Sequence, residues 1–352
     1  MRIIGAYICL MVIGCLTSIA GIGGGAVILP VYYIVADYSL QESLLLAVLT
    51  VAGSAISRVI YYLGRTERTG GKSLIQYDLL RLIIPFDTAT AAYGFILNLI
   101  LPNWVVLVVI CLIMSTVLVK TYKKTRKVRR LEQLRGPPDV AVEALPSVAR
   151  NFGEFGKNLK YLILYLFFIL AQSYLIQLKI FKEYCNWYYW LQTGCFTLLN
   201  VLVGWWLLPT LDQAKSTTRQ IIFFALQTGW LSTLLGIGGG MLINPLLLHH
   251  DYLPEHIVAT TSITIFFSAL TSSLQRLSEN TLEWYHLAGA LLAGLTSSGL
   301  AMVLNQRYIR RKSLIFVFLT IIITISFIVI TLSIGIEIIQ DGFEKFQNLC
   351  DQ

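Results

Sequence analysis

Long apolar stretches separated by short polar segments make up most of the chain, a pattern typical of helices that cross a membrane. A crossing helix needs roughly 20 consecutive, mainly apolar residues. By that measure the sequence predicts spans at residues 43–64, 79–100, 103–120, 160–180, 188–208, 255–277, 284–306 and 313–338. We therefore expect an all-α polytopic protein that is integral to a membrane and passes through it several times.

Two other apolar stretches are too long for one crossing. Residues 3–36 and 218–248 each continue for more than thirty positions, and the same string, Gly-Ile-Gly-Gly-Gly, interrupts both. A glycine inside a helix costs about 1 kcal/mol relative to alanine. Each stretch is therefore expected to form two helical pieces joined by unwound backbone at residues 20–25 and 235–240.

The two glycine strings belong to a duplicated unit. Residues 14–30 and 229–245 are identical at nine of seventeen positions, with a constant offset of 215. Carried forward, this offset sets the span 43–64 over residues 258–279. Such internal similarity indicates one structural unit used twice. It also argues against a cleaved signal peptide, because an internal segment matches the N-terminal one.

Basic residues indicate how the two copies are oriented, since cytoplasmic loops carry an excess of Lys and Arg. The loop 65–72 and the run 120–135 are basic in the first half. In the second half the counterpart loop, 276–283, carries glutamates, and the basic loop is 307–312. All basic loops face the cytoplasm if both broken segments turn back as hairpins, which leaves five crossings between inverted copies. Full crossing of both segments is the alternative and would make the copies parallel.

The expected organisation has five parts. They are a first transmembrane repeat (1–120), a basic cytoplasmic connector (121–158), two linking transmembrane helices (159–210), a second repeat (211–340) and a polar tail (341–352). Each repeat contains a hairpin and three spans.

Composition supports the membrane assignment and argues against nucleic acid as a partner. The chain is 56% hydrophobic and only 13% charged, against about 25% charged residues in soluble proteins. The net charge of +8 depends on the run 120–135, which holds eight of the 27 basic residues. A basic run beside an apolar helix is typical of a cytoplasmic face near anionic lipid head groups. The bilayer is therefore the expected partner.

The glycine motifs carry the candidate chemistry. Secondary transporters place broken helices of inverted repeats around a substrate site near mid-membrane. The first amides of a helical piece lack intrahelical partners and bind anions, and glycine permits a close approach. The expected substrate-binding residues here are Gly21, Gly23, Gly24, Gly25, Gly236, Gly238, Gly239 and Gly240. The alternative is that the glycines only let helices pack closely.

Polar residues within the spans are further candidates, because ionisable groups in a membrane are commonly functional. Arg58 and Asp87 lie on neighbouring spans at similar depth. They can form an ion pair that gates the path or relays a proton, unless Arg58 extends to the interface and Asp87 is hydrogen-bonded. Ser57 and Ser272 can donate to an oxyanion or bond backbone instead, and Asn244 can reach the same site. We expect no metal site and no cofactor.

Both motifs, their place at the start of each half and the four-segment unit resemble the TauE/SafE sulfite exporter family over most of the chain. The middle is similar to the eukaryotic, plant-type branch. The similar strings are Tyr77-Asp78-Leu79, Cys185-Asn186-Trp187-Tyr188-Tyr189-Trp190 and Arg307-Tyr308-Ile309-Arg310-Arg311. The resemblance implies a permease for sulfite, sulfonates or related small anions that is coupled to an ion gradient. A proton, relayed by Arg58 and Asp87, is the candidate coupling ion. Asp87 departs from the family, which has an apolar residue there.

Three classes of function were compared: an anion permease, a membrane-embedded enzyme and a receptor or scaffold that transports nothing. An enzyme would need a catalytic group of residues such as a Ser-His pair or facing Asp residues in the spans, and the sequence gives no indication of one. A receptor would have no need of a duplicated glycine break. A secondary transporter of small anions is the leading hypothesis, and another small organic anion is the alternative substrate.

Overall fold

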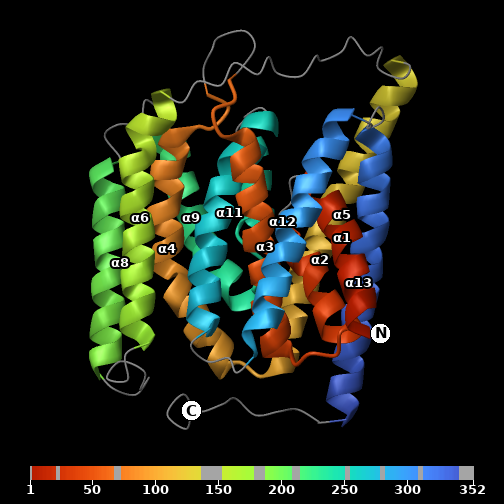
Figure 1. Ribbon diagram of the computed structural model, residues 1–352, viewed down its shortest axis with the longest axis horizontal. Coiled ribbons are helices and arrows are strands. Elements are labelled where there is room, and N and C mark those ends of the chain that lie inside the picture. Colours follow the sequence, from red (N-terminus) through yellow and green to blue (C-terminus); the bar gives the residue numbers. More distant parts are fainter. Residues whose placement is uncertain are drawn as a thin grey trace.

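The computed structural model describes residues 2–20, 24–66, 73–135, 153–177, 187–207, 215–249, 254–277, 282–307 and 312–340. In these residues the regular structure is helical, and one isolated bridge pairs Thr66 with Ser73. Figure 1 shows the long helices standing side by side as one bundle. The prediction of an all-α polytopic membrane protein is confirmed.

The helix boundaries follow the predicted spans closely. The elements are α1 (Arg2–Ala20), α2 (Gly25–Pro30), the π-helical η1 (Val31–Val35), α3 (Leu40–Tyr62), α4 (Tyr77–Ile100), α5 (Asn103–Arg135), α6 (Gly153–Gln177), α8 (Trp187–Leu207), α9 (Lys215–Leu235), α10 (Gly240–His249), α11 (Pro254–Leu277), α12 (Trp284–Arg307) and α13 (Lys312–Gln340). Among the described residues, five helices are long and apolar enough to cross a membrane, namely α3, α4, α5 up to Lys123, α11 and α12. The other predicted spans form α6, α8 and α13, which run alongside these (Figure 1).

Local sequence explains the start of α3 and the end of α5. Ser39 and Glu42 form a capping box, in which the Glu42 N–H donates to Ser39 Oγ and the Ser39 N–H donates to Glu42 Oε2. Two amides that lack helical partners are satisfied in this way. We expected the basic run 120–135 to be part of a connector, but α5 continues through it to Arg135. Lys, Arg, Leu and Gln are good helix formers, so the helix does not stop where its apolar part ends.

The first glycine-broken segment folds back on itself. Figure 1 shows α1 and α2 side by side. Ala6 and Tyr7 in the first half of α1 line the same small pocket, of about 10 Å³, as Tyr32 and Tyr38 at the far end of the segment. In one straight helix, Tyr7 and Tyr32 would lie about 37 Å apart. The segment is therefore a hairpin and both of its ends lie on one side of the bundle.

The second segment folds in the same way. A Cβ built on Gly239 would lie 2.6 Å from Cγ2 of Thr228 on α9, although these residues would be about 16 Å apart in a straight helix. The helix boundaries repeat with the offset of the sequence repeat, because α1 and α9 end at Ala20 and Leu235 and the following pieces begin at Gly25 and Gly240. The duplicated sequence thus forms two similar broken helices.

The helices α3 and α11 are antiparallel neighbours in the centre of the bundle. Arg276 near the end of α11 donates to Gln41 Oε1 at the start of α3, at 3.4 Å, and the Gln76 N–H beyond α3 donates to Thr260 Oγ1 near the start of α11, at 3.0 Å. The packing is also reciprocal, since α4 lies against α9 and α12 lies against α1. This pattern is expected of two units related by a twofold axis in the membrane plane. The symmetry itself stays a prediction.

Outer helices present apolar side chains on their outer surface. Trp205 and Trp206 on α8 are 69% and 73% exposed, and Phe167 on α6 is 66% exposed. In contrast, most of α3 and α11 is buried. Contiguous apolar surface of this kind marks contact with lipid, so the outer helices face the bilayer and the inner pair is shielded from it.

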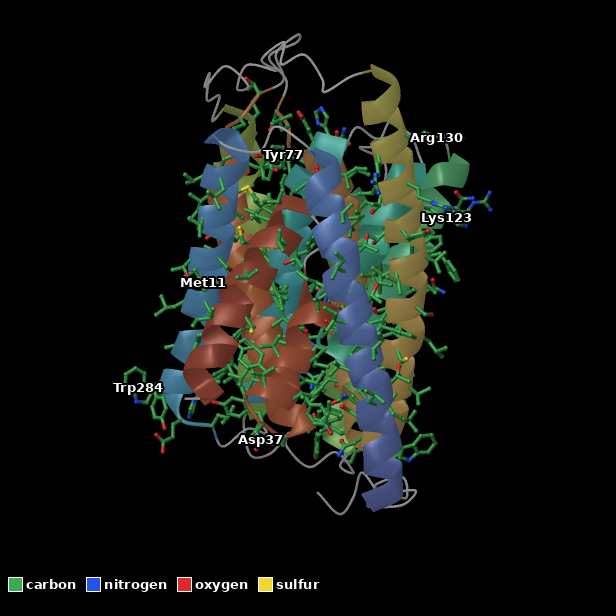
Figure 2. The ribbon with its side chains drawn as sticks, turned by 90° about the vertical axis from the view of Figure 1, so that its right-hand side faces the viewer. Met11, Asp37, Tyr77, Lys123, Arg130 and Trp284 are labelled. Carbon is green, nitrogen blue, oxygen red and sulfur yellow. The ribbon has the colours of Figure 1, made fainter. Side chains whose placement is uncertain are left out.

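Thiol labelling can test the orientation of the bundle. Figure 2 shows Asp37 and Trp284 at one end of the molecule and Lys123 and Arg130 at the other. In a variant without native cysteines, we expect Asp37→Cys and Trp284→Cys to react with an impermeant maleimide in intact cells. Arg130→Cys should react only after permeabilisation, because the sequence predicts that the basic run faces the cytoplasm. Reaction of Asp37→Cys and Arg130→Cys from the same side would contradict this topology.

Candidate functional site

The first glycine break is described from Gly24 onward, and Gly21 and Gly23 lie outside the described residues. Gly24 has φ 71°, in the left-handed region, and its carbonyl accepts hydrogen bonds from the amides of Val27 and Ile28, both at 3.0 Å. A β-carbon is strained in this conformation. The predicted break is therefore confirmed at Gly24, whereas Gly25 already begins α2.

The second break is described completely and is a tight glycine turn. Gly236 and Gly238 have φ of 62° and 66°. The Ile237 N–H donates to the Ser232 carbonyl at 3.3 Å, which is the Schellman arrangement that ends a helix with a left-handed glycine. Helix α10 then starts at Gly240. The non-helical backbone is 236–239, one residue shorter at each end than predicted.

The two breaks contact each other. A Cβ on Gly25 would overlap the backbone carbonyl of Ile237, so the start of α2 packs directly against the second break. The first intrahelical bonds are made by the amides of Val27 in α2 and Leu242 in α10. The amides just before Val27 and Leu242, at the start of each helical piece, therefore come too early in the helix to have an intrahelical carbonyl partner. Close packing explains why residue 25 is a glycine. The same contact brings the starts of α2 and α10 near each other.

Asp87 lies at the second break. A Cβ on Gly239 would be 3.6 Å from both Asp87 Oδ1 and Ser268 Oγ. Ser268 hydrogen-bonds to the Asp87 carboxyl group, and Ser232 Oγ lies 3.0 Å from Ser268 Oγ. Asp87 is 1% exposed, and its Oδ1 has no hydrogen-bond partner. A buried carboxyl oxygen therefore faces the glycine turn from the middle of α4.

The predicted ion pair between Arg58 and Asp87 is wrong. Within the described residues neither takes part in an ion pair, and Arg58 donates to the carbonyl and Oγ of Ser54, at 3.3 and 3.4 Å. The reason is the packing order, because α3 packs against α11 and α12 while α4 packs against α9 and α11. Arg58 is nevertheless 1% exposed and its Nη1 has no partner, so it does not extend to the interface either.

Sequence reasoning placed Arg276 in a loop, but the structure places it inside α11 with 3% exposure. Its Nη2 donates to the carbonyls of Thr233 and Leu234 at the end of α9, and its Nη1 donates to Asn98 Oδ1 at 3.1 Å. The arginine thus holds the end of the broken helix. The available signal was its position at the end of an apolar span, where a buried cation needs a partner.

The remaining predicted residues are not all gathered at the breaks. Ser57 donates to the Leu295 carbonyl of α12 at 2.7 Å, which is the backbone role that we considered as the alternative. Ser272 is buried and its hydroxyl has no partner. It lies one turn beyond Ser268 on α11, on the same face. Asn244 lies in α10, four residues after its start, and is half-buried.

The described residues include many buried hydroxyls on α11 but no cluster suited to a metal ion. Buried hydroxyl side chains follow one face of α11 at helical spacing, namely Thr261, Thr264, Ser268 and Ser272. In the described part of the chain, no three His, Cys, Asp or Glu side chains are grouped closely enough to hold a metal. Neutral hydroxyls with glycine-turn amides are suited to a hydrogen-bonding anion.

Comparisons with known proteins identify relatives of this chain. Residues 6–153 and 221–342 match the family described as Sulfite exporter TauE/SafE. Sulfite exporter TauE/SafE family protein 5 of Arabidopsis thaliana is 28% identical over 309 residues, which cover 74% of this chain and 67% of that protein. Family protein 6 of the same plant is 27% identical over 365 residues, covering 94% of this chain and 82% of that protein. No solved structure matches.

The matched ranges contain both glycine breaks and the helices that surround them. They leave out most of the two linking helices, α6 and α8, which lie between the halves. Most of the chain is covered, and the chain belongs to the TauE/SafE sulfite exporter family.

Proposed function

We propose that this protein is a secondary transporter that carries sulfite, a sulfonate or a related small organosulfur anion across a membrane, coupled to an ion gradient. Its family is one of membrane transporters, and the family description names sulfite. The observation that carries the proposal is the contact between two glycine-broken helices inside a buried bundle core. Unwound backbone at membrane depth is tolerated where it is buried in protein or lines a water-filled cavity, and transporters use such breaks as substrate sites.

The anion would bind where the two helical pieces start. The dipole of each piece places its positive end there, and the first amides are donors without intrahelical partners. Because Gly239 has no side chain, the backbone of the turn lies close to Ser268, and Ser272 adds a buried hydroxyl one turn farther along α11. Gly24, Gly236 and Gly238 would shape the turns through their left-handed backbone. In this proposal the glycines serve both packing and binding.

Asp87 would couple the anion to a proton. A carboxylate beside a bound anion is repelled by it, and two like charges a few ångströms apart rarely both remain ionised. Binding of the anion and of a proton at Asp87 would therefore favour each other. The groups that face Asp87 from α9 and α11, at Thr228, Ser232, Gly239 and Ser268, carry no charge.

Arg58 would act on the path as a fixed positive charge. It is buried on α3 without an acidic partner among the described residues. Because α3 rises from the end that carries Asp37 to the end that carries Tyr77 (Figure 2), Arg58 lies toward the predicted cytoplasmic side. There it would attract an anion toward the glycine turns and gate its passage.

Alternating access would follow from the paired architecture. Two hairpins that contact each other, held by antiparallel α3 and α11, can open toward either side by rocking one repeat against the other. This requires the two halves to be inverted repeats, as the sequence predicts.

Purified protein in proteoliposomes tests the function. We expect saturable accumulation of labelled sulfite when the outside is made more acidic than the inside, and little accumulation without a pH gradient. Competition by unlabelled sulfate, taurine and other sulfonates ranks the substrates. Flux equal to that of protein-free liposomes for every anion would contradict the proposal and favour a receptor or scaffold. If only an unrelated organic anion is transported, the protein is still a transporter but the proposed substrate is wrong.

A further inference from the structure

Carbonyls at the end of α9 accept hydrogen bonds from the glycine turn and from the helices α4 and α11. The Ser232 carbonyl accepts from the Ile237 N–H. The next two carbonyls, of Thr233 and Leu234, accept from Arg276 Nη2, and Leu234 also accepts from Asn98 Nδ2 at 2.8 Å. Three carbonyls of this last turn, those of Ser232, Thr233 and Leu234, therefore have a donor. Two of the three depend on one guanidinium group.

That guanidinium has no acidic partner. Arg276 Nη1 donates to Asn98 Oδ1 and Gln41 Oε1, which are both neutral amide oxygens. Within the described residues no carboxylate forms an ion pair with it. The negative end of the α9 dipole is therefore the feature that balances the buried positive charge. Charge and dipole meet at the glycine break.

In transporters with broken helices, the exposed carbonyls and C-terminal half-helix ends commonly coordinate a cation such as Na⁺. We propose that Arg276 is a tethered cation that occupies this position permanently. The protein would then need no bound metal cation at the second break. The coupling ion would be the proton that binds at Asp87. This inference rests on the proposed anion transport and names the ion that drives it.

In the described part of the first repeat, no arginine is bonded to the end of the broken helix as Arg276 is in the second. The position equivalent to Arg276 by the offset of 215 is Tyr61. Arg58 lies about one turn earlier, but it bonds to Ser54 of its own helix. The two repeats therefore differ in what their buried arginine bonds to: Arg276 bonds to the end of α9, whereas Arg58 bonds to its own helix. Such an asymmetry is expected when only one break takes part in coupling.

Ion replacement in wild-type proteoliposomes is the first test and needs no variant. We expect proton-driven sulfite accumulation to change less than twofold when all Na⁺ is replaced by choline. A requirement for Na⁺ would overturn the proposal while leaving anion transport intact. Absence of any sulfite flux would instead refute the proposed function, so the two failures are distinguishable.

The second test removes the tethered cation and returns it in solution. We expect Arg276→Ala to lose at least roughly tenfold in flux, which corresponds to about 1.4 kcal/mol. Millimolar guanidinium should restore at least half of the wild-type flux, whereas tetramethylammonium, which cannot donate hydrogen bonds, should restore none. Arg81→Ala is the control, because Arg81 pairs with Asp78 and Asn158, and it should keep wild-type flux under all conditions.

Thermal stability in detergent separates folding from coupling. If Arg276→Ala is folded and its flux is unchanged, or is lost and not restored by guanidinium, the proposal is wrong. If the variant does not fold, Arg276→Lys replaces it, because lysine keeps the charge and should retain Na⁺-independent flux. Na⁺-dependent flux in Arg276→Lys would also overturn the proposal.

Discussion

Replacing Gly239 by valine is expected to lower anion transport at least roughly 100-fold without unfolding the protein, a loss of about 2.7 kcal/mol in binding free energy. A side chain here would project toward Asp87 Oδ1 and Ser268 Oγ, each 3.6 Å from the position of its Cβ. The valine side chain would also press against Cγ2 of Thr228, which lies 2.6 Å from the position of its Cβ, and it would hinder close approach of an anion to the first amides of α10. Transport in proteoliposomes and thermal unfolding in detergent should be measured on the same preparation.

Three further variants separate binding from packing. Gly335→Val in α13 is the matched control, because a Cβ there meets no atom within 4 Å, and it should behave as wild type. Gly25→Ala should lower thermal stability, since its Cβ would overlap the backbone of Ile237. In Thr228→Ser/Gly239→Val the neighbouring Cγ2 is absent, so a purely steric defect would be relieved. Recovery of transport in this double variant would contradict a binding role for Gly239.

Asp87→Asn is expected to abolish accumulation driven by a pH gradient while leaving exchange of anions across the membrane in place. Asparagine has the shape of aspartate and keeps a hydrogen-bonding group toward Ser268, but it neither binds nor releases a proton. The anion would then no longer be repelled by a charge at this position. Counterflow of labelled against unlabelled sulfite, measured beside gradient-driven uptake, distinguishes loss of coupling from loss of binding.

Asp78→Asn provides the control for this prediction. Asp78 lies on the first turn of the same helix, and its side chain is 65% exposed, so it should not influence coupling. Gradient-driven accumulation in Asp87→Asn at the wild-type level would show that the proton binds elsewhere. Loss of both exchange and accumulation in a folded protein would make Asp87 part of the anion site instead.

Much of the backbone could be predicted because it follows from local rules. Apolar length predicted the spans, and the repeated Gly-Ile-Gly-Gly-Gly string predicted two breaks that the structure places at Gly24 and at 236–239. The repeat offset of 215 is reproduced at the helix boundaries on both sides of each break. Few residue types other than glycine adopt the left-handed backbone conformation, so these turns can be predicted from the sequence.

The polar contacts were harder to predict, because they depend on which helices are neighbours. Arg58 and Asp87 lie on consecutive spans, yet their helices pack mainly against other elements, and α11 contacts both. Asp87 therefore faces Gly239 and Ser268, which lie far away in sequence. In a bundle whose two repeats pack against each other, two spans that follow one another in the chain need not be in contact.

Arg276 illustrates a second limit. The sequence predicts that a charge at the end of an apolar span lies in the following loop, which is where most such charges lie. The structure buries it because the end of α9 exposes carbonyls that need donors. Leaving such buried carbonyls without a donor costs about 1–3 kcal/mol each. That requirement arises only once the glycine break has ended α9, and the sequence of α11 alone does not reveal it.

Binding of labelled sulfite to the purified protein tests the central claim most directly, because it examines the glycine site without depending on coupling or orientation. Scintillation proximity in detergent or nanodiscs reports the amount bound at equilibrium. We predict saturable binding to the wild type and to Gly335→Val, with at least roughly 100-fold weaker binding to Gly239→Val. Equal binding by Gly239→Val and the wild type, with both proteins folded, would contradict the claim that the glycine breaks hold the anion.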